Sequence, residues 1–170
     1  MPLTLTSSSA GHFVRVVDAE SRSWVAVATV IIGDRDRAEE VVQEVLARLV
    51  GRWAKIEGLD RPGAFVRRAV INEAISVHRR QRRELVANER AAGRLDLRDS
   101  APADPHVDLW SAVRRLPDDQ MRAIALRHAA DASLGEVADA LGITEAAART
   151  VLYRARKTLR AELSNQEVTR

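Results

Sequence analysis

The segment Ser133–Arg160, SLGEVADALGITEAAARTVLYRARKTLR, contains two short helical patterns that meet at a single glycine. Ser133 and Glu136 have the S-x-x-E spacing of a capping box, which predicts that a helix begins after Ser133. Gly142 can take the positive φ that a sharp helix exit requires. Thr144 is suited to cap the helix that follows. The segment therefore predicts a helix-turn-helix.

The second helix of this pair is the basic one. Its predicted core residues are Ala148, Val151, Leu152, Ala155 and Leu159, and Ile143 is expected to fill the corner between the two helices. Exposed residues early in such a helix can reach base edges in a DNA major groove, whereas later basic residues contact phosphates. We therefore predict a DNA-binding face made of Glu145, Ala146, Arg149, Thr150, Tyr153, Arg154, Arg156 and Lys157.

The composition favours a helical protein with a small aliphatic core. The chain has 170 residues, 46% of them apolar, which is enough for one ordinary domain or two small ones. Aromatic residues make up only 4% and cysteine is absent, so the core must be built from Ala, Val, Leu and Ile. No segment alternates convincingly between polar and apolar residues. The fold class is predicted to be all-α.

Two helical units joined by a flexible linker are expected. The first unit spans 13–84, the linker 85–108 and the second unit 109–163, with a disordered tail at 1–12 and another tail at 164–170. The linker contains Gly93, Pro102 and Pro105 and loses helical periodicity. The first unit should begin with a helix over 13–32, with a break near Ser21 as an alternative.

The second helix of the first unit is predicted to follow the segment GDRD, 33–36. Gly33 would stop the preceding helix, and Asp36 and Glu39 have capping-box spacing. Apolar residues then form one stripe, and the opposite face is polar and largely acidic. This outward face consists of Glu40, Gln43, Glu44 and Arg48.

A third helix, over 63–83, combines an apolar stripe with a basic ridge. Pro62 suits its first turn. Its stripe is Val66, Ala69, Val70, Ala74 and Val77. A basic helix end can simply pair with the helix dipole and remain solvated, but here polar residues recur along the ridge before the run HRRQRR. The ridge residues predicted to bind nucleic acid are Arg68, Asn72, Ser76, His78, Arg79, Arg80 and Arg83.

Several functional classes are disfavoured by the sequence. The segment MPLTLTSSSAGH has no basic start followed by an apolar stretch, and no run approaches the ~18 apolar residues of a membrane span. A cytoplasmic protein without a membrane partner is therefore expected. The four histidines are scattered, and there is no Gly-rich phosphate loop or nucleophile elbow. We expect no enzyme activity, no catalytic residues, no metal and no cofactor.

Taken together, the two halves resemble a bacterial sigma factor of the extracytoplasmic-function group. GDRDRAEEVVQEVLARLVGRW is similar to the core helix of region two, and RPGAFVRRAVINEAISVHRRQRR to the helix that recognises the promoter minus-ten element. LPDDQMRAIALRHAADASLGEVADALGITEAAARTVLYRARKTLR resembles region four, whose helix-turn-helix reads the minus-thirty-five element. The resemblance covers nearly the whole chain.

The resemblance implies partners for each face. Core RNA polymerase, through the clamp helices of its β′ subunit, would contact the polar face that includes Glu40 and Arg48. Promoter DNA would contact the basic ridge at minus-ten and the helix-turn-helix at minus-thirty-five. An anti-sigma factor that masks these surfaces is a further partner implied by the family.

The chain departs from the family pattern at two positions. Val151 stands where an arginine is common in the recognition helix, and Met121 replaces a frequent arginine after LPxxQ. Both leave the fold intact but affect which promoter sequence is read. Two alternatives remain on sequence grounds: a one-component helix-turn-helix regulator that acts without polymerase, and a helical adaptor that binds only proteins.

Overall fold

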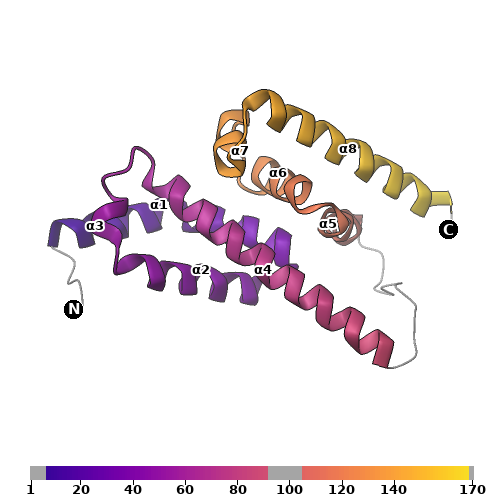
Figure 1. The fold of residues 1–170 in the computed structure, drawn as a ribbon, viewed down its shortest axis with the longest axis horizontal. Helices are drawn as coiled ribbons and strands as arrows, with labels where there is room; N and C mark the ends of the chain where they lie inside the picture. The colour runs from indigo at the N-terminus through magenta and orange to yellow at the C-terminus, as the bar shows by residue number, and fades with distance from the viewer. Residues whose placement is uncertain (1–6, 92–104, 169–170) are drawn as a thin grey trace.

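The protein is all-α within the residues that the computed structural model describes, 7–91 and 105–168 (Figure 1). Eight helices lie in these two ranges. In chain order they are α1 (Ser7–Ile32), α2 (Arg35–Val50), α3 (Trp53–Ile56), α4 (Pro62–Ala91), α5 (Pro105–Arg115), α6 (Asp118–Ala129), α7 (Leu134–Leu141) and α8 (Glu145–Val168).

The first unit is a bundle in which α1, α2 and α4 pack on one another, with the short α3 at one end (Figure 1). Most of the predicted apolar stripe of α2 is buried, with Leu46 only partly so, and Trp53 at the start of α3 is buried too. Val66, Val70, Ala74 and Val77 of α4 are buried as well, which confirms most of the predicted stripe of that helix. The polar face of α2 is thereby turned outward.

The start of α2 differs from its prediction by two residues. Asp34 is the N-cap, and its Oδ1 accepts a hydrogen bond from the backbone N–H of Arg37 (3.0 Å). The predicted capping box at Asp36 and Glu39 is wrong, because the helix has already begun at Arg35. Glu39 instead accepts a hydrogen bond from Arg35 Nε (2.9 Å), one turn earlier. Gly33 ends α1 with φ of 88°, as its position in the sequence predicts.

Helix bounds also differ from the sequence-based boundaries. Residues 7–12, predicted to be a disordered tail, are helical, because Ser9 donates to Glu57 (2.5 Å) and His12 packs on Trp53. α1 continues through Ser21 without a break. α4 extends through the first residues of the predicted linker, α5 begins before 109, and α8 continues past 163. The remainder of the linker, 92–104, lies outside the described residues.

The second unit contains the predicted helix-turn-helix. Ser133 Oγ accepts from the backbone N–H of Glu136 (3.2 Å), and the Glu136 carboxylate accepts from the Ser133 N–H (2.9 Å). Gly142 has φ of 68° and Thr144 Oγ1 accepts from the N–H of Ala147 (3.2 Å). These features confirm the predicted caps and corner. Ile143 is 37% exposed, so it does not fill the corner as predicted, and Val137 and Ala138 are the buried residues of α7.

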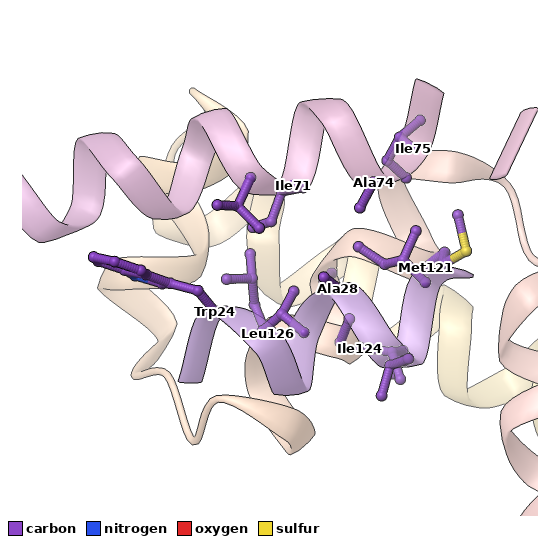
Figure 2. Close-up of a cluster of buried hydrophobic side chains, with 14 of the residues drawn as sticks. Trp24, Ala28, Ile71, Ala74, Ile75, Met121, Ile124 and Leu126 are labelled. Carbon is purple, nitrogen blue, oxygen red and sulfur yellow. The ribbon is translucent and has the colours of Figure 1, made fainter. Parts of the chain in front are cut away.

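The two units share one continuous apolar core. α5 and α6 pack on α1, and α7 packs on α4. Figure 2 shows Trp24 and Ala28 of α1 and Ile71, Ala74 and Ile75 of α4 in one cluster with Met121, Ile124 and Leu126 of α6. Ile71 and Ile75 do not belong to the stripe predicted for α4, because they face the second unit. The two predicted helical units are therefore docked on each other in the structure. No helix in the described ranges is long and apolar enough to cross a bilayer.

Candidate nucleic-acid interface

The basic ridge of α4 is an exposed surface along most of its length. Arg68, Asn72, Ser76, Arg79, Arg80 and Arg83 all have exposed side chains. Because α4 continues to Ala91, the ridge extends further than the sequence predicted. A groove of about 710 Å³ lies along this extension, lined by Ser76, Arg79, Arg82, Arg83, Val86, Ala87 and Arg90. This combination of guanidinium groups with apolar side chains suits a nucleic-acid strand, which offers phosphates and flat bases.

Arg82 and Arg90 are additions to the predicted ridge. The spacing of Arg79, Arg83 and Arg90 follows the three- and four-residue repeat of a helix face. That repeat was an available signal, but the predicted helix ended at Arg83 and left Arg90 outside it.

His78 does not lie with the exposed ridge. Its imidazole is half-buried at the contact between the two units, where Nε2 donates to the backbone carbonyl of Arg114 (3.1 Å). Burial lowers the pKa of His78 below its ordinary value, with smaller lowering effects from Arg82 and Arg114. The Arg114 carbonyl and Asp118 act in the opposite direction on this pKa. The neutral imidazole is therefore the form that this contact favours.

Arg79 belongs both to the ridge and to the contact between units. Its Nε donates to Asp118 Oδ2 (2.7 Å), and its Nη2 donates to the same oxygen. The side chain of Arg79 is still 63% exposed. A phosphate or base could reach this guanidinium, but it would compete with Asp118 for the same donors.

The eight residues of α8 that were predicted to face DNA are all exposed, from Glu145 near the corner to Lys157 about three turns further on. Ala148, Leu152, Ala155 and Leu159 anchor the opposite side of the helix in the core. Tyr153 is 65% exposed. The Thr150 hydroxyl donates to the Ala146 carbonyl (3.1 Å), so its oxygen lone pairs remain able to accept.

Two arginine side chains make the surroundings of His128 positive. The pKa of His128 is lowered by burial and then by the charges of Arg156 and Arg127. The same guanidinium groups that disfavour a protonated imidazole favour an approaching phosphate. Their effect on His128 is thus a local sign of an anion-attracting surface.

The outward face of α2 carries the third group of predicted site residues. Glu40, Gln43, Glu44 and Arg48 are all exposed on one side of the helix. Arg37 Nη1 donates to Glu40 (2.6 Å), and this bond raises the pKa of Arg37. Arg48 Nη2 donates to Glu73 of α4 (2.8 Å). The face is a mixed polar surface that could bind a partner protein by complementary charge.

No candidate metal site is found among the residues that the structure describes. Among the described residues there is no group of three or more His, Asp or Glu side chains that could hold a metal ion.

Two family descriptions match the chain, one over each unit. Residues 16–84 match Sigma-70 region 2, and residues 106–159 match Sigma-70, region 4. The first match includes α2 and the ridge of α4, and the second includes the helix-turn-helix and the basic face of α8.

Curated relatives match over most of both chains. An RNA polymerase sigma-E factor of Streptomyces coelicolor is 31% identical over 159 residues, which is 89% of this chain and 86% of the relative. The RNA polymerase sigma-E factor of Streptomyces antibioticus is 28% identical over 160 residues, or 92% of this chain and 87% of the relative.

A solved structure has a similar fold. It is a co-crystal structure of the sigma factor RpoE in complex with the anti-sigma factor NepR from Bartonella quintana. The TM-score is 0.60 at 23% identity, over 94% of this chain and 98% of that one.

Proposed function

Because this chain belongs to the extracytoplasmic-function sigma factors of bacterial RNA polymerase, we propose that its three polar faces divide the steps of promoter recognition among them. As a sigma factor it binds core RNA polymerase and promoter DNA and directs initiation at specific promoters. We propose which side chains make these contacts. The observation that carries it is the presence of two exposed basic helices, one in each matched region.

The ridge of α4 is assigned to the minus-ten element. Asn72 and Ser76 supply an amide and a hydroxyl that can pair with a base edge, and Arg80 and Arg83 supply planar cations. Such groups suit a base taken out of the stack as the duplex melts, because a guanidinium can stack on its face while an amide reads its edge. Arg82 and Arg90 extend the path for the backbone of the same strand.

The exposed face of α8 is assigned to the minus-thirty-five element. Arg149 lies in the early part of the helix, where a side chain in a major groove can reach guanine O6 and N7. Arg156 and Lys157 lie further along and are assigned to phosphates. Val151, where the family often has arginine, is partly buried, so Arg149 and Arg154 are the basic residues left to read bases nearby.

The outward face of α2 is assigned to the β′ clamp helices of core polymerase. Gln43 and Glu44 are its central residues, and both are exposed. Glu40 and Arg48 flank them and are already paired with Arg37 and Glu73. Because this surface has an acidic centre and a basic edge, complementary charges on a partner protein would fix its orientation as well as attract it.

Cytoplasmic localisation and regulation by an anti-sigma factor are part of the same proposal. A protein that acts within RNA polymerase must be present where transcription occurs. The similar RpoE fold was crystallised with an anti-sigma factor, NepR, which supports a protein inhibitor as a partner for this chain too.

The test is run-off transcription with core polymerase and this protein on a library of promoters, followed by sequencing of the transcripts. The expected result is initiation at defined start points downstream of two sequence elements. A one-component regulator would instead bind a palindromic operator without co-purifying with core polymerase. Binding of that kind, with no directed initiation, would contradict the proposal.

A further inference from the structure

Of the eight residues of α8 that are assigned to DNA, only Glu145 is acidic. Its side chain is exposed, and it makes no ion pair and no side-chain hydrogen bond with any other residue that the structure describes. A carboxylate beside DNA is repelled by the phosphates. Glu145 would therefore weaken binding to every promoter unless it gained a specific contact.

Glu145 stands at a position from which bases can be reached. It is the first residue of α8, directly after the turn from α7 (Figure 1). The start of α8 is already capped by Thr144, whose Oγ1 accepts from the backbone N–H of Ala147 (3.2 Å). Residues at the N-terminal end of a recognition helix are the ones that contact base edges in the major groove. Glu145 is therefore available for a base.

The carboxylate of Glu145 lies against α7. A methyl group on Gly135 would be 3.0 Å from Glu145 Oε1, which is closer than ordinary van der Waals contact. Gly135 lies in the first turn of α7, where alanine would be the better helix former. The absence of a side chain at Gly135 therefore leaves room for the Glu145 side chain, which crosses the corner of the helix-turn-helix.

Arg149 follows Glu145 by one helical turn on the same exposed face of α8. Residues at this spacing have Cβ atoms about 5 to 6 Å apart, and successive base pairs of B-form DNA are about 3.4 Å apart. The two side chains can therefore reach bases that are one or two base-pair steps apart. They are not paired with each other among the described residues, so both remain free to bind a base.

The chemistry of a carboxylate limits which base it can bind. In the major groove only adenine, through N6, and cytosine, through N4, present a hydrogen-bond donor. An ionised carboxylate accepts hydrogen bonds and donates none. Adenine places the acceptor N7 beside N6, where it would repel the second carboxylate oxygen, whereas cytosine has no acceptor on its own edge. Cytosine is therefore the base that suits Glu145.

We propose that Glu145 is a specificity-determining residue, which selects a cytosine in the upstream element through its N4 amino group, and that Gly135 positions the carboxylate. The inference rests on the proposed function, because it concerns the same contact with the minus-thirty-five element. The selected cytosine lies one or two base pairs from the guanine that is assigned to Arg149.

The test is transcription by core polymerase with the full-length protein, on a promoter library randomised in the upstream element. Glu145→Gln keeps the length of the side chain but replaces the carboxylate by an amide, which can pair with N6 and N7 of adenine. The matched control is Asp139→Asn, which removes one negative charge from α7 at a side chain that is 67% exposed and outside the assigned faces. Sequencing of the transcripts gives the base preference at each position.

The wild-type protein and Asp139→Asn are expected to favour cytosine at one position. Glu145→Gln should lower the preference for cytosine over adenine there by at least about fivefold and leave the other positions unchanged. A wild-type protein without a cytosine preference, or an unchanged preference in Glu145→Gln, would overturn the inference and leave the proposed function intact. If the wild-type protein directed no initiation at defined start points, the proposed function would be overturned, and this inference with it.

Gly135→Ala separates positioning from folding. Alanine favours a helix, so the thermal unfolding midpoint should not fall, whereas part of the cytosine preference should be lost because the carboxylate has to move. Gly135→Ala/Glu145→Gln should lose no more of the preference than Glu145→Gln alone, since both residues act through one contact. An unchanged preference in Gly135→Ala would overturn the positioning role.

A purely structural role of Glu145 gives a different result. A carboxylate in the first turn of a helix can interact favourably with the helix dipole. If this were its only role, Glu145→Gln would lower the unfolding midpoint and leave the base preference at every position unchanged, which would overturn the inference.

Discussion

Arg79 of α4 and Asp118 of α6 form an ion pair that joins the basic ridge of the first unit to the second unit. Arg79 Nε lies 2.7 Å from Asp118 Oδ2, and Nη2 also donates to that oxygen. The side chains are 63% and 28% exposed. A solvent-exposed pair of this kind contributes at most about 1 kcal/mol and is weakened by salt. The pair can therefore weaken the binding of a phosphate or base to Arg79, but it does not prevent it.

Asp118→Asn is expected to increase the affinity of the free protein for minus-ten DNA by up to about fivefold, because Arg79 no longer has to leave a carboxylate. Fluorescence anisotropy with a forked minus-ten probe measures this change. Asp119→Asn is the matched control, since it removes the same charge from the first turn of α6. Equal effects of the two substitutions would mean that overall charge, and not release of Arg79, is responsible.

Arg149→Ala is expected to reduce initiation selectively, at promoters whose upstream element carries the base that it reads. A bidentate contact to guanine contributes about 1 to 3 kcal/mol of discrimination. Sequencing transcripts from a library randomised in the upstream element measures the change. A uniform loss across the library would instead assign Arg149 to a phosphate.

Lys157→Ala is expected to weaken binding to all promoters alike. Loss of one phosphate contact reduces the slope of log K against log salt by about 1. The slope is measured by titrating promoter DNA at several salt concentrations. An altered sequence preference with an unchanged slope would contradict the phosphate assignment.

Gln43→Ala/Glu44→Ala is expected to weaken assembly with core polymerase at least about fivefold, equivalent to about 1 kcal/mol. Affinity for a minus-ten probe should not change, since α2 and the ridge are separate faces. Competition for core polymerase against a labelled wild-type protein measures this effect. Glu39→Gln is the control on the same helix, because Glu39 lies outside the assigned face and pairs with Arg35.

The docked protein is expected to lose stability as the solution is acidified through the range in which histidine titrates. Burial lowers the pKa of His78 in the folded state, so the unfolded chain, with a pKa of about 6.5, binds protons first as the pH falls. Stability is therefore complete above that value and declines below it until the folded-state pKa is passed.

Urea unfolding at about pH 8 and about pH 5.5 measures this decline, and His78→Gln should make it smaller. The pKa of His128 is lowered as well, so His128 contributes separately to the loss of stability, and His128→Gln should remove that contribution. The pKa of Glu136 is also lowered, but this affects stability only as the pH falls below the ordinary value of 4.5, outside the range of the experiment. If His78→Gln lost as much stability between the two pH values as the wild-type protein, a role for the burial of His78 would be contradicted.

Features set by neighbouring residues could be predicted from the sequence. Ser133, Glu136 and Thr144 act on backbone groups within one turn, so their spacing was sufficient to place two helix starts. The cap of α2 shows the limit of such signals. Asp34 and Asp36 are both suitable caps, and only the backbone conformation of Asp34 decides between them.

Features that depend on the docked units could not be predicted in this way. Ile71 and Ile75 lie off the stripe that packs within the first bundle, and nothing local indicates that α6 would cover them. His78 was grouped with Ser76 although residues two apart do not share a helix face. The position of His78 off the exposed ridge thus follows from local spacing, whereas its hydrogen bond to Arg114 depends on a contact between distant segments.

The first turn of α4 leaves no space for a side chain at Gly63. A methyl group there would overlap the carboxylate of Glu20, the residue that holds Arg67 from the side of α1. A carboxylate at the end of a flexible side chain can rotate away, so a larger residue would leave the bundle folded but deprive Arg67 of one partner. A substitution at Gly63 should therefore loosen the connection that Arg67 makes between Glu20 of α1 and Glu136 of α7, although residue 63 lies outside the three polar faces.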